Sequence, residues 1–262
     1  MDTSDEQQKI TNIHQTTWRY IRKNCRIQIL ILVVLFIVGI PLFPLAGIIV
    51  AIAVASYFYV RRKMWAEFVQ ELGQSIGFSY AATATPDTVT SKLLSIGRDV
   101  VITDVLSGSY KDIPVRMYTY LYIVGAGKQS TSYTFLIFEV TFQGTMPEIF
   151  IASKFHFLNG FPPETMSMGK LLKVEGDFNT YFYPLVLENK EIEALELLTP
   201  DVMAGLIDRV SKISLEFSGN KMYIYSRMSS INSTTDMQAK LELVEYLSVL
   251  CKRNASEIKD NE

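Results

Sequence analysis

The sequence has few of the residues that build metal and redox sites. It holds two histidines and two cysteines in 262 residues. His14 and His156 lie far apart in the chain, as do Cys25 and Cys251, so no zinc-ligand spacing is present. Isolated cysteines are typical of reduced thiols in a cytosolic environment. We therefore expect no metal and no cofactor.

Clustered positive charge is also scarce. The formal net charge is −2, and basic blocks occur only beside the apolar stretch described next. Nucleic-acid-binding domains carry a basic patch or stripe that neutralises phosphates, and the remainder of this chain is mildly acidic. The composition argues against a nucleic-acid partner.

Charge is missing altogether from Ile27 to Val60, which contains no Asp, Glu, Lys or Arg. A bilayer core about 30 Å thick requires roughly 20 apolar residues as a helix. This stretch predicts an integral membrane segment, with the lipid bilayer as its partner.

The membrane segment is too long for one straight span. As a single helix it would extend about 51 Å at about 1.5 Å per residue. Pro41 and Pro44 interrupt its middle, where both would break helical hydrogen bonding. The prolines predict a turn between two short helices, Ile27–Ile40 and Leu45–Val60. One tilted span with a proline kink remains the alternative.

Basic residues flank both ends of the stretch and favour the hairpin. Positive residues mark the cytoplasmic side, and a hairpin places both clusters there. These flanking residues are Arg22, Lys23, Arg26, Arg61, Arg62 and Lys63. The prediction is an integral protein of the cell membrane with its soluble part in the cytoplasm.

The remainder of the chain predicts one soluble domain over residues 64–253. Residues 1–26 read as a polar N-terminus with a juxtamembrane helix, and residues 254–262 as a loose tail. Apolar spacing near 3.6 predicts helices that end at Gly77, follow Thr85-Pro86, follow Thr199-Pro200, and cover about Thr235–Lys252. The fold class is α+β, an antiparallel sheet packed by helices.

Period-two alternation predicts the strands of that sheet. Val115–Ile123 and Thr134–Phe142 should pair antiparallel across the loop Gly125–Thr131, and Gly219-Asn220 should form a two-residue hairpin turn. The other predicted strands are Val100–Leu106, Glu148–Phe155 and Tyr181–Leu187.

Four tyrosines gather on the alternate face of the predicted hairpin. Tyr118, Tyr120 and Tyr122 share one strand face, and Tyr133 joins them across the loop. An exposed aromatic surface of this kind suits a protein partner. The same pattern also fits a second buried face beneath a helix.

Candidate catalytic groups are sparse. Gly125-Ala126-Gly127-Lys128 lacks the first glycine and the Ser or Thr of a phosphate-binding loop, so a plain hairpin loop is the better interpretation. His156 is the only histidine in the soluble part. Six carboxylates could supply acid–base chemistry or bind a divalent ion, and the same residues also fit a solvated acidic face. They are Glu175, Asp177, Glu188, Glu191, Glu193 and Glu196.

Two further segments carry a family resemblance. They read Leu-Lys-Val-Glu-Gly-Asp-Phe-Asn at 172–179 and Leu-Thr-Pro-Asp-Val-Met at 198–203. Together with the basic flank and apolar hairpin, the chain from about residue 25 to 228 resembles an uncharacterised class of bacterial membrane proteins, a domain of unknown function. The resemblance implies a transmembrane hairpin, a soluble α+β domain and a bacterial origin.

These features predict a membrane-anchored, non-enzymatic protein that displays a cytoplasmic interaction or scaffold domain. Its partners would be another protein or a second copy of itself. One alternative is a membrane-surface enzyme that uses the carboxylates or His156. The other is a single-span protein with an exported domain.

Overall fold

The computed structural model describes residues 30, 33–34, 44–155, 161–187, 190–210, 213–226, 231 and 233–259. The chain divides into two compact units. The first comprises residues 1–76 with 232–235, and the second comprises residues 77–231 with 236–262. Each unit is described by itself.

The first unit contains the long helix α2, Pro44–Ser75. The predicted helix Leu45–Val60 and the amphipathic helix that follows it form this one continuous element. No proline or glycine lies between Gly47 and Gly73, so nothing interrupts it. Pro44 occupies the first helical position, which tolerates proline. Gly77, with φ of 76°, follows the helix end.

Much of the predicted hairpin lies outside the described residues. This holds for Pro41, for nearly all of Ile27–Ile40, and for the basic residues Arg22, Lys23 and Arg26. Arg61, Arg62 and Lys63 lie on α2 and are exposed. In the part of the chain that is described, no helix meets the length and apolarity required to cross a membrane.

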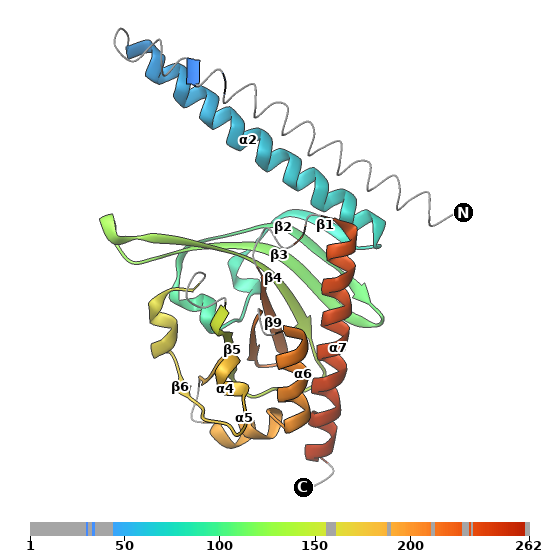
Figure 1. Ribbon diagram of the computed structural model, residues 1–262. Helices are drawn as coiled ribbons and strands as arrows, with labels where there is room; N and C mark the ends of the chain where they lie inside the picture. The colour runs from blue at the N-terminus through green and yellow to red at the C-terminus, as the bar shows by residue number, and fades with distance from the viewer. Residues whose placement is uncertain are drawn as a thin grey trace, which may run out of the picture. The chain divides into compact units, whose positions relative to one another are not determined.

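The second unit is built on one antiparallel sheet of nine strands in the order β1-β2-β3-β4-β9-β8-β5-β7-β6 (Figure 1). Their bounds are β1 Ser79–Ala84, β2 Arg98–Tyr110, β3 Ile113–Val124, β4 Thr131–Thr141, β5 Ile149–Ser153, β6 Lys170–Leu171, β7 Phe182–Val186, β8 Ser214–Ser218 and β9 Lys221–Ser226. The predicted α+β class with an antiparallel sheet is confirmed. β1 and β6, the two edge strands, were not predicted.

The predicted hairpins are confirmed. β3 pairs antiparallel with β4 from Val115↔Val140 to Val124↔Thr131. β8 and β9 are joined by Gly219-Asn220, where Gly219 has φ of 60° as such a turn requires. The second hairpin joins the two parts of the sheet, because β9 pairs with β4 and β8 pairs with β5.

The helices of the second unit are α4 Phe178–Tyr181, α5 Glu191–Leu197, α6 Pro200–Val210 and α7 Thr234–Lys259. The cap at Thr199 is confirmed, since its carbonyl accepts the Met203 amide at 2.9 Å. The similar Thr85-Pro86 signal opens only the 3-10 turn η1, Pro86–Thr88, and η2, Leu93–Ile96, follows it. The segment after Thr85 is thus two 3-10 turns instead of the predicted helix.

One face of the sheet is apolar and lies under α6 and α7 (Figure 1). The helix predicted over about Thr235–Lys252 is α7, and its apolar residues Met237, Leu241, Val244 and Leu247 are buried. Lys111, in the β2–β3 turn, binds the Glu245 carboxylate of α7 at 2.7 Å. Directly opposed residues on β3, β4, β9 and β8 form an apolar row on this face, Met117, Phe138, Ile224 and Leu215.

Candidate functional site

The tyrosine face is buried by other parts of the same unit. Tyr118, Tyr120 and Tyr122 are at most 4% exposed, and Tyr133 is half-buried. The exposed interaction surface predicted at these residues is therefore wrong for the first three. The alternative of a second buried face is correct as to burial, although residues 85–97, which cover part of it, form 3-10 turns and no α-helix. Burial raises the pKa of Tyr120 to about 12, because the phenolate would lose its hydration.

The tyrosine face belongs to a second core with an aromatic centre. Tyr122 stacks on Tyr133 and Phe135, with ring centroids 5.6 Å and 6.2 Å apart. Phe161 stacks on Phe135 at 4.6 Å and meets Tyr225 edge-on at 5.4 Å. These rings join strands that are far apart in sequence.

Residues 85–97, which we call the strap, cover part of this face without forming an α-helix. Leu93 and Leu94 of the strap are buried in the aromatic core. A Cβ at Gly97 would overlap the Tyr122 ring, so the backbone passes directly over that tyrosine. Irregular backbone carries amides that no regular ladder satisfies, and those amides require partners when buried.

The buried carboxylate of Glu216 supplies such partners. Its Oε1 accepts the Lys92 amide at 2.7 Å and the Leu93 amide at 3.2 Å. Its Oε2 accepts the Ser91 hydroxyl at 2.6 Å and the Tyr225 hydroxyl. Complete burial raises the pKa of Glu216, because desolvation outweighs the four hydrogen bonds that favour the charged form.

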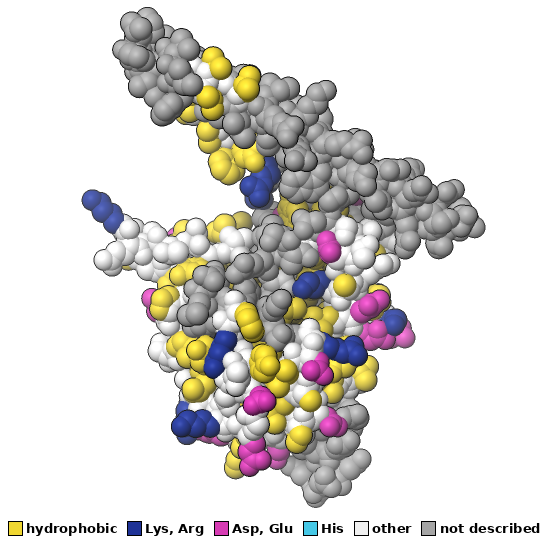
Figure 2. All heavy atoms as spheres, in the orientation of Figure 1, with side chains coloured by type: hydrophobic (Ala, Val, Ile, Leu, Met, Phe, Trp, Pro, Cys, Tyr) yellow, Lys and Arg dark blue, Asp and Glu magenta, His cyan; other side chains and the backbone are white. Residues whose placement is uncertain are grey.

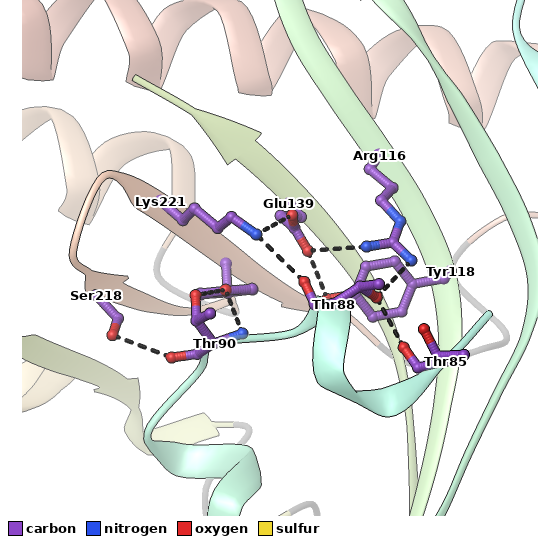
Figure 3. Close-up of polar contacts among 9 residues, drawn as sticks. Thr85, Thr88, Thr90, Arg116, Tyr118, Glu139, Ser218 and Lys221 are labelled. Atoms are coloured by element: carbon purple, nitrogen blue, oxygen red, sulfur yellow. Dashed lines mark hydrogen bonds and ion pairs between the residues drawn. The ribbon is translucent and has the colours of Figure 1, made fainter. Parts of the chain in front are cut away.

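A second carboxylate, Glu139, holds the other end of the strap (Figure 3). It binds Lys221 Nζ at 2.8 Å, lies 3.8 Å from Arg116, and accepts the Tyr118 hydroxyl at 3.0 Å. Both cations also reach Thr88, Arg116 to its hydroxyl at 3.0 Å and Lys221 to its carbonyl at 3.3 Å. The ion pairs thereby fix η1 to the sheet.

Between the two carboxylates, Tyr223 completes the attachment. Its hydroxyl accepts the Thr90 amide at 3.2 Å, and Ser218 donates to the Thr90 carbonyl at 3.3 Å. Arg116, Glu139, Tyr223 and Glu216 are directly opposed on β3, β4, β9 and β8. We call these four residues the polar row.

Sequence analysis did not identify the polar row. Glu216 lies between the buried Leu215 and Phe217, and Glu139 between Phe138 and Val140. A carboxylate at an alternate strand position predicts exposure when one sheet face is assumed to be solvated. Recognising that both faces are buried would have marked these acids as hydrogen-bonded groups inside the fold.

The polar row acts as a structural attachment for the strap. Its carboxylates are 5% exposed at Glu139 and fully buried at Glu216, and each is engaged by donors within the fold. Among the described residues, no three histidine, cysteine or carboxylate side chains gather as a metal site requires. The polar row therefore holds the strap against the sheet through hydrogen bonds and ion pairs.

The carboxylates predicted as catalytic candidates do not gather in the described structure. Glu175, Asp177, Glu193 and Glu196 are exposed, and Figure 2 shows acidic side chains dispersed over the visible face. Glu191 binds Lys170 at 2.7 Å, and that hydrogen bond lowers its pKa. His156 and Glu188 lie outside the described residues.

Comparisons with known proteins bear on the fold. No protein-family model and no curated protein matches the sequence. The crystal structure of the mycobacterial trehalose monomycolate transport factor A, TtfA, is similar with a TM-score of 0.50 and 9% sequence identity. The match covers 71% of this chain and 93% of that one. At this identity the chain shares the fold of TtfA, and the likeness extends no further.

Proposed function

We propose that this chain is a membrane-anchored, non-enzymatic protein whose α+β domain serves as an interaction or scaffold domain on the cytoplasmic side. The anchor in this proposal is a hairpin of Ile27–Ile40 and Leu45–Val60. The following observations support the proposal, beginning with the one that carries it.

The carrying observation is the apolar surface of the first half of α2. Ile52, Phe58 and Tyr59 are 61%, 58% and 70% exposed. At 100° per residue these side chains point in different directions around the helix. A helix that is apolar all round belongs in a protein core or in a bilayer. Exposed Arg61, Arg62 and Lys63 follow immediately, as at a membrane boundary.

The second unit supports a binding role over a catalytic one. Its buried carboxylates hold the strap, and the described acids that were catalytic candidates are exposed at four of five positions. No described observation favours the enzyme alternative. The fold neighbour TtfA is named as a transport factor, which places this architecture in a transport role in that protein. We assign no cargo to the present chain.

The membrane topology provides the first test. In a background with Cys25→Ser and Cys251→Ser, one cysteine is added after Glu262 and, in a second variant, introduced as Ser4→Cys. Intact cells are treated with a membrane-impermeant maleimide and compared with lysed cells. We expect both cysteines to be protected until lysis, because a hairpin places both termini in the cytoplasm.

Different labelling patterns would overturn the topology. Labelling of only the C-terminal cysteine in intact cells would indicate a single span with an exported domain. Recovery of the chain in the soluble fraction would exclude the anchor. For the interaction role, a pull-down in mild detergent that recovered neither a partner nor a second copy would contradict the proposal.

A further inference from the structure

The two edges of the sheet differ in how they resist pairing with another strand. An edge strand exposes unpaired amides and carbonyls, and natural proteins protect such edges with short length, lysine, proline or bulges. β6 and β1 are the two ends of the strand order. The comparison between them identifies the edge that lacks these protections.

The β6 edge is protected. It contains only two residues, Lys170 and Leu171. Lys170 binds Glu191 of α5 at 2.7 Å, so a charged pair lies beside the short edge. A strand this short offers too few backbone groups to support a stable ladder.

The β1 edge has none of these protections. Its six residues, Ser-Tyr-Ala-Ala-Thr-Ala, include no charge and no proline. Its register with β2 is unchanged between Ser79↔Ser107 and Ala84↔Ile102, with no pair at Ala82. Ala81, Ala82 and Thr83 are exposed, and small side chains leave the backbone accessible. The second edge of β1 has no neighbouring strand among the described residues.

We propose that β1 pairs with β1 of a second copy, extending the sheet through a twofold axis. In an antiparallel pair, two directly opposed residues point their backbone amides either both toward the partner strand or both away from it. The twofold axis must therefore pass through a residue, and the most central choices are Ala81 and Ala82. The first opposes Tyr80 to Ala82, and the second opposes Tyr80 to Ala84. Neither register opposes two like charges, so no charge repulsion opposes pairing of the strand with its own copy.

The contact between the two β1 strands is small, and holding both copies on one membrane would strengthen it. A strand of six residues is about 20 Å long, and its edge buries less than the roughly 800 Å² per partner of a standard interface. Copies held on one bilayer have a raised effective concentration, which strengthens weak association. This step rests on the proposed membrane anchor.

Disulfide cross-linking of the full chain tests the pairing. In the Cys25→Ser, Cys251→Ser background, Ala81→Cys and Ala82→Cys are oxidised in native membranes and in mild detergent. A residue on the twofold axis meets its own copy at a Cα separation of about 4.5–5.5 Å, within disulfide reach. Ala126→Cys, in the exposed β3–β4 loop, is the matched control. We expect disulfide dimers from at least one β1 position and not from the loop.

A lysine at the edge provides the second measurement. Ala82→Lys would bring two ammonium groups close together across the axis, and we expect it to weaken dimerisation by about tenfold or more. Ala126→Lys adds the same charge elsewhere and should leave the dimer intact. Light scattering of the detergent-solubilised chain measures the dimer fraction, and circular dichroism verifies the fold of each variant.

Specific outcomes would overturn the proposal. They are equal cross-linking at β1 and at Ala126, or a dimer that Ala82→Lys leaves unchanged, which would place the interface elsewhere. The cross-linking and labelling experiments together distinguish failure of the β1 pairing from failure of the membrane anchor. Absence of cross-linking with a protected C-terminal cysteine rejects only the β1 dimer. Cross-linking with external labelling rejects only the cytoplasmic topology.

Discussion

Strands β3, β4, β9 and β8 carry two rows of side chains, one on each face of the sheet, and the two rows are one residue apart in sequence. The apolar row of Met117, Phe138, Ile224 and Leu215 lies on one face, and each member is followed or preceded in sequence by a member of the polar row. Both rows are largely buried. Side chains alternate between the faces of a strand, so neighbouring residues enter different environments.

The difference follows from what covers each face. α7 satisfies its own backbone hydrogen bonds and requires only apolar packing from the sheet. The strap is irregular, and Glu216 and Tyr223 satisfy its amides. A helical cover therefore permits an apolar row, whereas an irregular cover requires polar side chains among the apolar ones of its face. The following predictions test this contrast in order of expected effect.

The largest effect is expected on the face that carries the apolar row. Phe138 is fully buried at the centre of the apolar row. Phe138→Ala should lower the free energy of unfolding by about 3–5 kcal/mol, because it removes buried contacts and leaves a cavity. Denaturant titration of the full chain in detergent measures the loss. Hydrogen exchange should accelerate across the whole sheet, and a change confined to the strap would contradict the contrast.

A smaller and more local effect is expected at Glu216. Glu216→Ala leaves the Lys92 and Leu93 amides without their acceptor and should cost about 2 kcal/mol. Exchange of these two amides should accelerate more than that of β3 or β4 amides. Glu216→Gln is the matched control, since its carbonyl oxygen still accepts both amides, and its loss should be about 1 kcal/mol. Equal strap exchange in both variants would mean that the acceptor does not hold the strap.

The close approach of the strap to the sheet predicts an effect at Gly97. Gly97→Ala would drive a methyl group into the Tyr122 ring and should cost about 1–2 kcal/mol. Thermal unfolding measures the loss. Adding Tyr122→Leu should make the effect of Gly97→Ala smaller, because the shorter side chain leaves room for the methyl group. Strictly additive losses would show that the two residues are not in contact.

The smallest effect concerns pH. Burial raises the pKa of Glu216 in the folded state above its unfolded value of about 4.3. The folded state therefore binds this proton more tightly, and the stabilisation is fully present below the unfolded pKa and is lost as pH rises through the folded pKa. Relative to Glu216→Gln, the native chain should lose stability as pH rises from about 4. Parallel stability profiles for the two proteins would contradict this linkage.

Part of the fold could be predicted because its signals are local. The alternation in Thr134–Phe142 and the turn at Gly219-Asn220 each depend on a few adjacent residues, and both are confirmed. The cap at Thr199-Pro200 opened α6 as expected, whereas the same dipeptide pattern at Thr85-Pro86 gave only 3-10 turns. In the strap, tertiary hydrogen bonds to Glu216 and Tyr223 replaced helical ones.

The candidate site could not be predicted because its partners are distant in sequence. Ser91 and Glu216 are 125 residues apart, and Thr90 and Tyr223 are 133 residues apart. The tyrosines showed correctly which face they share, but whether that face meets solvent depended on the path of the strap and on Phe161.

The sequence by itself determined which residues prefer helix or strand, the two-residue turn at Gly219-Asn220, the apolar stretch and its basic flanks, because these depend on propensity and periodicity within short windows. Tertiary structure decided that both sheet faces are buried, that two carboxylates lie inside the fold, and that one edge strand is short and charged while the other has no second neighbouring strand among the described residues. Those properties depend on strand order and on which segments cover the sheet, and a periodic pattern is the same whether a face meets water or another part of the chain.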